Sequence, residues 1–296
     1  MFIVNRLDAA GSAPYESLTF QYARPLLRGL DQAGGTIAVG AEWTEGNMKE
    51  AAGLLVINVR EAAAEVVSVF VAAKFRRRGI GSALFHRAEA ILRGMGIAKL
   101  SFVYYSGKAI TPALEAFLNR GGWSEPIMDG KVYKTDARIA EASWIRKTAM
   151  PAGMRSFYWH ELSGEEKDRL AKLEGSLYPA FLSPFKTRLT LEESNSLGLR
   201  IRGKTVGWCM TYRIAGDTLL YDSVYIAPEY RLSGVAFMLV AQSVLIQLER
   251  NIPNAIFAVN RESPFMRKML DRWLAPYATG ISERNIAYKD LSASGG

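Results

Sequence analysis

The chain has 296 residues, of which 49% are hydrophobic and 22% are charged, and its formal net charge is +8. This composition is ordinary for a folded globular protein and excludes a low-complexity or disordered chain. The length suits two domains better than one. A single cysteine, Cys209, excludes an internal disulfide and favours a reducing, cytoplasmic location.

The apolar runs are all shorter than the ~20 residues that a membrane helix needs, and the first ten residues lack the apolar core of a signal peptide. We therefore expect neither a membrane segment nor a leader. The basic excess is diffuse, because 19 basic against 14 acidic residues give +5 over 1–150, and 18 against 15 give +3 over the rest. Such a spread disfavours a nucleic-acid partner and suits an anionic small ligand. With only two histidines and one cysteine, we expect no metal site.

In the first half, apolar periodicity predicts helices and β-branched runs predict strands. The expected order is a helix over 15–32, strands over 36–43, 51–59 and 66–71, a helix over 82–96, a strand over 99–105 and a helix over 111–123. Residues 136–153 predict a short helix and a linker that ends at Pro151 and Gly153.

The second half repeats this order. It predicts a strand over 155–162, a helix capped by Ser163 with Glu166, a hairpin over 197–214, a strand over 217–226, a helix over 237–250, a strand over 255–259 and a helix over 263–274. An ordered repeat of this length indicates two copies of one domain. We expect domains over 1–136 and 154–296, joined by a linker over 137–153.

One thirteen-residue stretch occurs twice. VFVAAKFRRRGIG, residues 69–81, returns as VYIAPEYRLSGVA, residues 224–236, which is 155 positions later (224 − 69). In both copies a strand runs into Arg-x-x-Gly-x-(Gly/Ala), and a helix begins at once. Glycine allows a sharp turn and a close approach of a ligand to the backbone, and the first N–H groups of a helix attract anions. The pattern predicts a phosphate-binding loop in each copy.

On these residues the chain resembles the GNAT superfamily of acyl-CoA-dependent N-acetyltransferases, whose signature is a strand followed by (Gln/Arg)-x-x-Gly-x-(Gly/Ala). The resemblance implies an α/β fold in each domain: a mostly antiparallel, twisted α+β sheet with flanking helices and a splayed central strand pair. It implies acetyl-CoA as the co-substrate. The residues that would bind coenzyme A are Val69, Val71, Arg76, Arg77, Arg78, Gly79, Ile80, Gly81 and Ser82 in the first copy, and Ile226, Arg231, Gly234 and Ala236 in the second.

The resemblance also implies catalytic roles. Some family members carry a glutamate general base eleven residues before the signature arginine, and Glu65 holds that position here, whereas the second copy has Leu220. We therefore expect the first domain to be the catalytic one. The tyrosine that many members use as general acid is replaced by Leu118 and Leu270 in the two copies. We expect Tyr105, next to Tyr104 at the end of the fifth strand, to act as the general acid instead.

The implied activity is transfer of an acetyl group from acetyl-CoA to a primary amine, directly within a ternary complex. The acceptor would be a small molecule or a peptide. In the alternative hypothesis one domain, most simply the second, is catalytically silent and serves as an acyl-CoA-binding regulatory or interaction module. Acceptor identity, acyl-chain length, and the choice between a monomer and a homodimer stay open. Cys209, beside Trp208 in a predicted strand, predicts a buried structural thiol.

Overall fold

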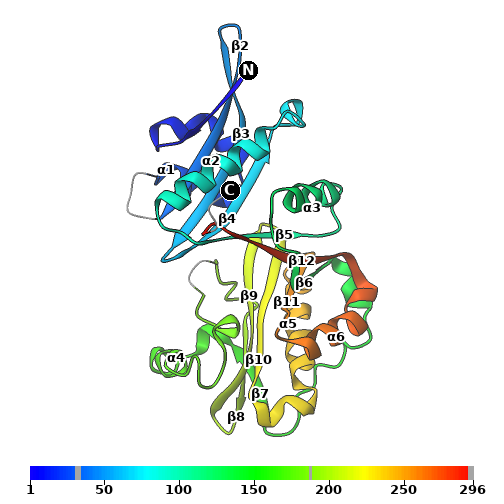
Figure 1. Cartoon of the computed structure of the whole chain (residues 1–296). Coiled ribbons are helices and arrows are strands. Elements are labelled where there is room, and N and C mark those ends of the chain that lie inside the picture. The colour runs from blue at the N-terminus through cyan, green and yellow to red at the C-terminus, as the bar shows by residue number, and fades with distance from the viewer. Residues whose placement is uncertain (31–34, 187–188, 293–296) are drawn as a thin grey trace. The chain divides into compact units, whose positions relative to one another are not determined.

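The structure, a computed structural model, describes residues 1–30, 35–186 and 189–292 (Figure 1). It consists of two compact units: unit 1 comprises Met1–Met128 with the chain from Arg284 onward, and unit 2 comprises Asp129–Glu283. Each unit has the mixed α/β architecture that the sequence predicts. Within the described ranges, no helix combines the length and the apolar character needed to cross a bilayer, and no group of three metal-ligating side chains is found.

The sheet of unit 1 has the strand order β1-β2-β3-β4-β5-β12. The strands are β1 (Phe2–Arg6), β2 (Thr36–Glu45), β3 (Met48–Arg60), β4 (Ala63–Val71), β5 (Lys99–Tyr105) and β12 (Ala278–Asp290). Neighbouring strands are antiparallel except β4 and β5, which are parallel. A parallel pair needs a long crossover, and α2 provides it here.

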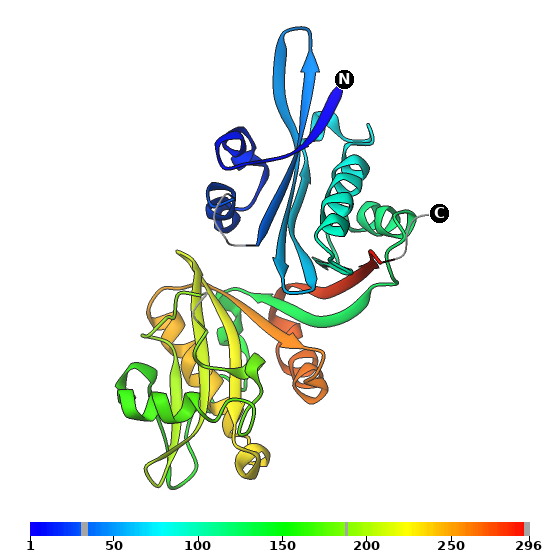
Figure 2. The ribbon, with the colours of Figure 1, turned by 60° about the vertical axis from the view of Figure 1, so that its left-hand side comes forward.

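The two faces of this sheet are covered differently. Helices α2 (Ile80–Gly94) and α3 (Thr111–Arg120) cover one face, and the 3-10 turns at Ala10–Leu18 with α1 (Arg24–Arg28) cover the other (Figure 2). Apolar side chains of α2, such as Leu84 and Leu92, are fully buried against the strands, as the helical periodicity predicts. A smaller core joins Leu27 to the opposite face.

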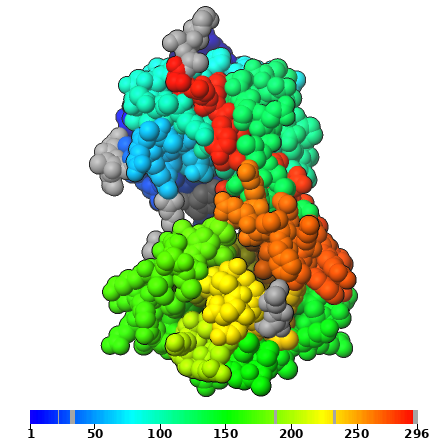
Figure 3. All heavy atoms as spheres, turned by 60° about the horizontal axis from the view of Figure 1, so that its bottom comes forward, coloured from blue at the N-terminus to red at the C-terminus, as the bar shows by residue number. Residues whose placement is uncertain are grey.

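Unit 2 repeats the plan with the strand order β6-β11-β10-β9-β8-β7. The strands are β6 (Ile127–Thr135), β7 (Met154–Tyr158), β8 (Leu197–Ile201), β9 (Lys204–Ala215), β10 (Thr218–Ile226) and β11 (Asn254–Asn260), and the helices are α4 (Gly164–Ala171), α5 (Val235–Glu249) and α6 (Pro264–Trp273). Here β10 and β11 form the parallel pair, with α5 as the crossover. Helix α6 lies at the surface of the unit (orange in Figure 3), where Phe265 is exposed.

Two strands, β6 and β12, have no counterpart among the expected elements. Strand β6 reads IMDGKVYKT and β12 reads ATGISERNIAYKD, so charges and glycines interrupt the apolar pattern that marks the other strands. Each completes the sheet that the other half of the sequence builds: β6 pairs with β11 in unit 2, and β12 pairs through Arg284–Asp290 with β5 in unit 1. The compact units therefore differ from the expected domains, 1–136 and 154–296. Strand β6 belongs mostly to unit 2, and the paired part of β12 belongs to unit 1.

Three local expectations can be compared directly. The helix expected over 15–32 is wrong: the chain forms 3-10 turns up to Leu18 and starts a new short helix with Pro25 in its first turn, because proline cannot continue a helix. Its expected end at 31–34 lies outside the described residues. The strand expected over 155–162 ends at Tyr158. The cap at Ser163 is confirmed, since its hydroxyl accepts a hydrogen bond from the Glu166 N–H at 3.2 Å.

Candidate functional site

The central strands of unit 1 separate halfway along their length. β4 and β5 pair only from Ala63 to Val66, and the register between β4 and β3 shifts at Val67, which marks a β-bulge. A bulge bends the strand and ends regular pairing. Beyond it, the β5-facing edge of β4 opens into a cleft, so the expected splay is confirmed.

This first cleft has a volume of about 640 Å³, within the ~300–1,000 Å³ range of ligand pockets. Its walls are the end of β4, the following loop, the start of α2 and one face of α3. The lining residues are Val69, Phe70, Val71, Phe75, Arg76, Arg77, Gly79, Ile80, Gly81, Ser82, Phe85, Ile110, Ala113, Leu114, Phe117 and Arg120. Eight of the nine residues expected to bind coenzyme A in this domain are thus brought together around one cleft.

The loop at the mouth of the cleft has the backbone of an anion site. Gly79 has φ 81° directly before α2, a conformation that glycine adopts easily. A Cβ placed there would find nothing within 4 Å, so a ligand can approach the backbone closely at this point. Arg77 also has a left-handed φ of 61°, which is uncommon for a residue with a side chain and marks a constrained turn. No side chain caps the helix start. The first N–H groups of α2 therefore point outward without intrahelical acceptors.

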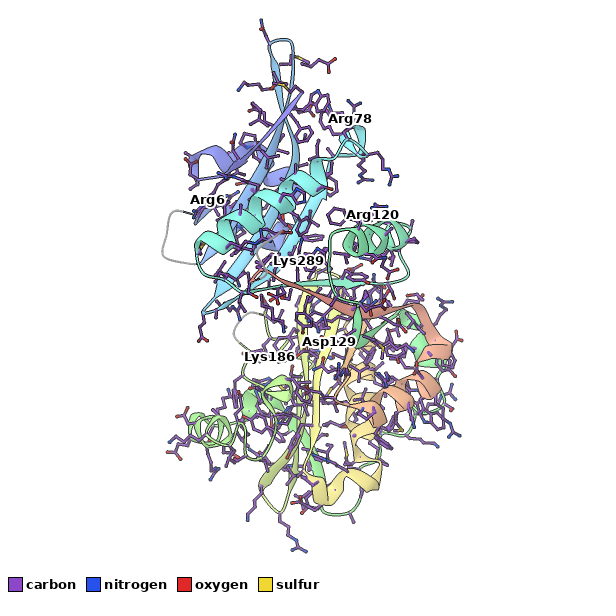
Figure 4. All side chains as sticks on the ribbon, viewed as in Figure 1. Arg6, Arg78, Arg120, Asp129, Lys186 and Lys289 are labelled. Atoms are coloured by element: carbon purple, nitrogen blue, oxygen red, sulfur yellow. The ribbon has the colours of Figure 1, made fainter. Side chains whose placement is uncertain are left out.

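The arginines of the signature divide into different roles. The Arg76 Nε donates a hydrogen bond to the Val71 carbonyl at 2.9 Å, which holds the loop against the strand end. Arg78 lies 4.7 Å from the centre of the Trp43 ring and does not line the cleft. Arg77 and Arg120 line it with exposed charge (Arg78 and Arg120 are labelled in Figure 4). Arg120, at the end of α3, was not among the expected site residues, because no local pattern indicates which helix will return over the loop.

These residues suit acetyl-CoA. Outward N–H groups at a helix start, with arginines beside them, match a pyrophosphate in charge and hydrogen-bonding type. The apolar walls formed by Phe85, Leu114 and Phe117 suit the uncharged pantetheine arm. The unpaired edge of β4 offers backbone groups along that path. The cleft thus combines one charged end with one apolar channel.

The two expected catalytic residues lie on the sheet face opposite α2. Glu65 is exposed on β4 and pairs in register with Ser101, two residues before the bulge. Tyr105 is 40% exposed at the end of β5, and its ring lies 5.9 Å from the Lys108 ammonium. At ~3.3 Å per residue, the four residues from Ser101 to Tyr105 span about 13 Å. The two side chains therefore reach different parts of the opening.

The neighbours of these residues are less suited to proton transfer. Tyr104 is buried and donates to the Glu115 carboxylate at 2.9 Å, and burial together with this bond raises its pKa above the ordinary tyrosine value. Leu118, at the position of the family's tyrosine, is 1% exposed within the core. In unit 2, Leu270 lines the second cleft.

The second cleft repeats the geometry of the first. β10 and β11 pair only from Thr218 to Tyr221, and the register to β9 shifts at Asp222. Gly234 has φ 73° directly before α5, whose start is uncapped. The Arg231 Nε donates to the Ile226 carbonyl at 3.0 Å, the same bond that Arg76 makes to Val71. The splay expected for this domain is also confirmed.

The contents of the second cleft differ. Its volume is about 110 Å³, below the usual range of ligand pockets. Of the four residues expected to bind coenzyme A, only Ala236 lines it, whereas Ile226 is buried in the core. Cys209 is fully buried, and burial raises the pKa of its thiol to about 12, which suits a structural role.

Residues 5–116 match the model of the acetyltransferase (GNAT) family. No curated protein matches the chain in sequence. Among solved structures, it is similar to a tandem GNAT protein from the clavulanic acid biosynthesis pathway, with a TM-score of 0.73 and 16% identity over 100% of both chains. It is also similar to a GCN5-related N-acetyltransferase from Sphaerobacter thermophilus, with a TM-score of 0.62 and 16% identity over 99% of this chain and 96% of the other.

A glucosamine N-acetyltransferase region in a fungal multi-domain β-N-acetylglucosaminidase gives a TM-score of 0.69 and 14% identity, over 97% of this chain and 38% of that one. At such identities the structural likeness shows the fold, while the family match rests on the first domain. The sequence match to the acetyltransferase (GNAT) family is thus confined to residues 5–116, and the whole chain has the fold of a tandem GNAT protein.

Proposed function

We propose that the first domain transfers an acetyl group from acetyl-CoA to a primary amine, as the resemblance implies. The observation that carries the proposal is the meeting of two features in one cleft of unit 1. An uncapped helix start follows Gly79, and the splayed edge of β4 leads inward from it. The first provides for the charged end of the cofactor, and the second guides its acyl end toward the bulge at Val67.

In this proposal the pyrophosphate binds to the N–H groups of Ile80, Gly81 and Ser82. Arg77 and Arg120 add positive charge beside it. The pantetheine arm lies along Val69 and Val71, where it replaces the missing strand neighbour. N–H groups at the bulge polarise the thioester carbonyl, and this interaction strengthens as negative charge develops on the oxygen.

The acceptor amine approaches from the face that carries Glu65 and Tyr105. Glu65, directly or through water, removes a proton from the ammonium group, and the neutral nitrogen attacks the thioester carbon. The C–N bond forms and the C–S bond breaks. Tyr105, about level with Val69 along the splayed strands, gives its proton to the departing thiolate. It is reprotonated, through water, by the second proton that the attacking nitrogen loses as the amide forms. The products are an amide, free coenzyme A and one proton.

The second domain is the silent one in this proposal. Leu220 stands at the position of Glu65, and the second cleft is narrow. The alternative hypothesis, an acyl-CoA-binding regulatory or interaction module, requires that cleft to accept the cofactor.

The test is calorimetric titration of acetyl-CoA into the wild type and into Gly79→Glu and Gly234→Glu. These variants are matched, since both glycines have positive φ (81° and 73°) and open space around a Cβ, so both substitutions place a side chain in the left-handed region without a clash. We expect at least a 100-fold loss of affinity in Gly79→Glu, because the new carboxylate repels the pyrophosphate, and no change in Gly234→Glu. Free-thiol release with a panel of amines then tests transfer itself.

Loss of binding only in Gly234→Glu would assign the cofactor to the second domain. A wild type that binds no acetyl-CoA would overturn the proposal.

A further inference from the structure

The second cleft differs from the first at corresponding positions. With the 155-residue offset, Ser82 corresponds to Phe237 and Phe85 to Val240, and each residue lines its own cleft. The helix that flanks each cleft ends with Arg120 in unit 1 and Trp273 in unit 2. Aromatic rings therefore stand in unit 2 where a hydroxyl and a guanidinium stand in unit 1. Among the described residues that line the second cleft, none supplies a positively charged side chain for an anion, as Arg77 and Arg120 do in the first.

Further aromatic packing encloses the pocket on its helix side. Trp144, from the segment expected to be a linker, packs edge-on against Phe237 with ring centres 5.9 Å apart. Its Nε1 donates to the Trp273 carbonyl at 2.9 Å, so its polar atom is satisfied and its ring faces the pocket. These rings line the cleft that corresponds to the one proposed to hold the pantetheine arm in unit 1.

The opposite side is closed by the segment at Phe181 and Leu182, which both line the pocket. The Leu182 carbonyl accepts hydrogen bonds from the Ser223 hydroxyl at 2.6 Å and from the Trp208 Nε1 at 3.0 Å. Lys186 pairs with Asp222 and donates to the Phe181 carbonyl at 3.0 Å. In unit 1 the corresponding serine, Ser68, bonds instead to the Thr19 hydroxyl.

Electrostatics define what such a pocket accepts. Among the described residues that line it, Asp222 alone is charged, and Lys186 neutralises it. The remaining lining is apolar or aromatic, apart from Asn260, Ser263 and the Tyr221 hydroxyl, which is bound to Gln247. A charged ligand would lose its hydration and would find no unneutralised charge among the described residues that line the pocket. Enclosed apolar cavities of ~150 Å³ take up benzene-sized molecules.

We propose that the second cleft is a binding site for a small uncharged hydrophobic molecule, of about the size of a benzene ring, and that it does not bind coenzyme A. The ligand fills the space bounded by Phe237, Val240 and Phe257 under the closing segment at Phe181. This site is separate from the proposed acetyl-transfer site and does not require it.

The experiment measures the unfolding temperature, Tm, of the full chain in the presence of toluene, ethylbenzene or benzylammonium. Benzylammonium has the size of ethylbenzene but carries a positive charge. At a ligand concentration of ~10 Kd, we expect toluene or ethylbenzene to raise Tm by about 3 °C. Benzylammonium should give no shift. Val240→Phe, which installs the residue found in unit 1, should abolish the toluene shift by filling the pocket.

Ser82→Phe is the control, since it adds a ring to the first cleft at the position of Phe237 and should retain the toluene shift. Saturation-transfer NMR with toluene on the wild type gives a second readout that does not depend on how Val240→Phe folds. Absence of toluene binding in the wild type, equal shifts with benzylammonium, or an unchanged shift in a folded Val240→Phe would overturn the proposal. Two equivalents of acetyl-CoA per chain would also overturn it, whereas zero equivalents would contradict only the proposed function.

Discussion

The two clefts share a backbone and differ in their side chains. Both domains keep the parallel strand pair that separates at a bulge, the left-handed glycine before a helix, and the arginine that bonds to the carbonyl five residues earlier. The first cleft is lined by three arginines and the second by a neutralised aspartate among aromatic rings. The shared backbone makes an opening in each sheet, and the lining residues decide what can enter it.

Alkaline pH should produce the largest difference in stability between the two units. The tyrosines and the cysteine with raised pKa values are Tyr15 and Tyr104 in unit 1, and Tyr133, Tyr178, Cys209, Tyr212, Tyr221 and Tyr225 in unit 2. Burial is the main cause for each. A group whose pKa is raised in the folded state contributes its full stabilisation at pH values below its pKa in the unfolded chain, which is about 9 to 10. This stabilisation is lost as the pH rises toward the pKa in the folded state, which is about 12 for Cys209 and Tyr212.

Between pH 8 and 10.5 we expect a loss on the order of 1 kcal/mol per group. Unit 2 should therefore lose several times more stability than unit 1. Scanning calorimetry at both pH values measures this, with acetyl-CoA added to identify the transition of unit 1. Equal losses in the two units would contradict the expectation.

Breaking the ion pair that anchors β12 should destabilise unit 1. Glu89 on α2 is 4% exposed, and its carboxylate lies 2.5 Å from the Lys289 ammonium. Lys289→Met leaves a buried carboxylate with only the more distant Arg93 at 3.4 Å, so we expect a loss of about 3 kcal/mol. Lys74→Met, which breaks an exposed pair with Glu50, should cost less than about 1 kcal/mol. Urea unfolding measures both, and similar losses would show that β12 is held in another way.

Removing Arg120 should weaken the first cleft's hold on the cofactor. Arg120→Met retains much of the apolar stem but loses the charge near the proposed pyrophosphate, so we expect about tenfold weaker acetyl-CoA binding, or ~1.4 kcal/mol. Arg272→Met, on the corresponding helix of unit 2, is the control and should leave affinity unchanged. Equal affinities in wild type and Arg120→Met would exclude Arg120 from the site.

The smallest effect is expected at Gly81. Its φ is not positive, and a Cβ there would meet only the Phe117 ring at an ordinary 3.9 Å. The second domain carries Ala236 at this position. Gly81→Ala should therefore change acetyl-CoA affinity less than threefold, about 0.6 kcal/mol. A much larger loss in the same titration would mean that the ligand approaches the backbone at Gly81 more closely than at Gly79.

The fold was largely predictable because its signals are local. A glycine that ends a strand and starts a helix, as at Gly79, is visible within a few residues, and so is the Ser163 cap. The splay followed from the family resemblance and not from the residues themselves. The partners of β6 and β12 could not be predicted, since pairing over more than 100 residues leaves no local mark. Arg120 was missed for the same reason, as a helix brings it to the loop from another part of the chain.

The exchanged strands also affect the synthesis of this chain. Residues 1–128 supply five strands of unit 1, but the sixth, Arg284–Asp290, is made only after all of unit 2 has been translated. Until then β5 has an unpaired edge, which is open to wrong partners. On the ribosome, the domain that is synthesised first therefore completes its sheet only at the end of translation. If the chain were divided at residue 136, each half would lack a strand that the other half carries.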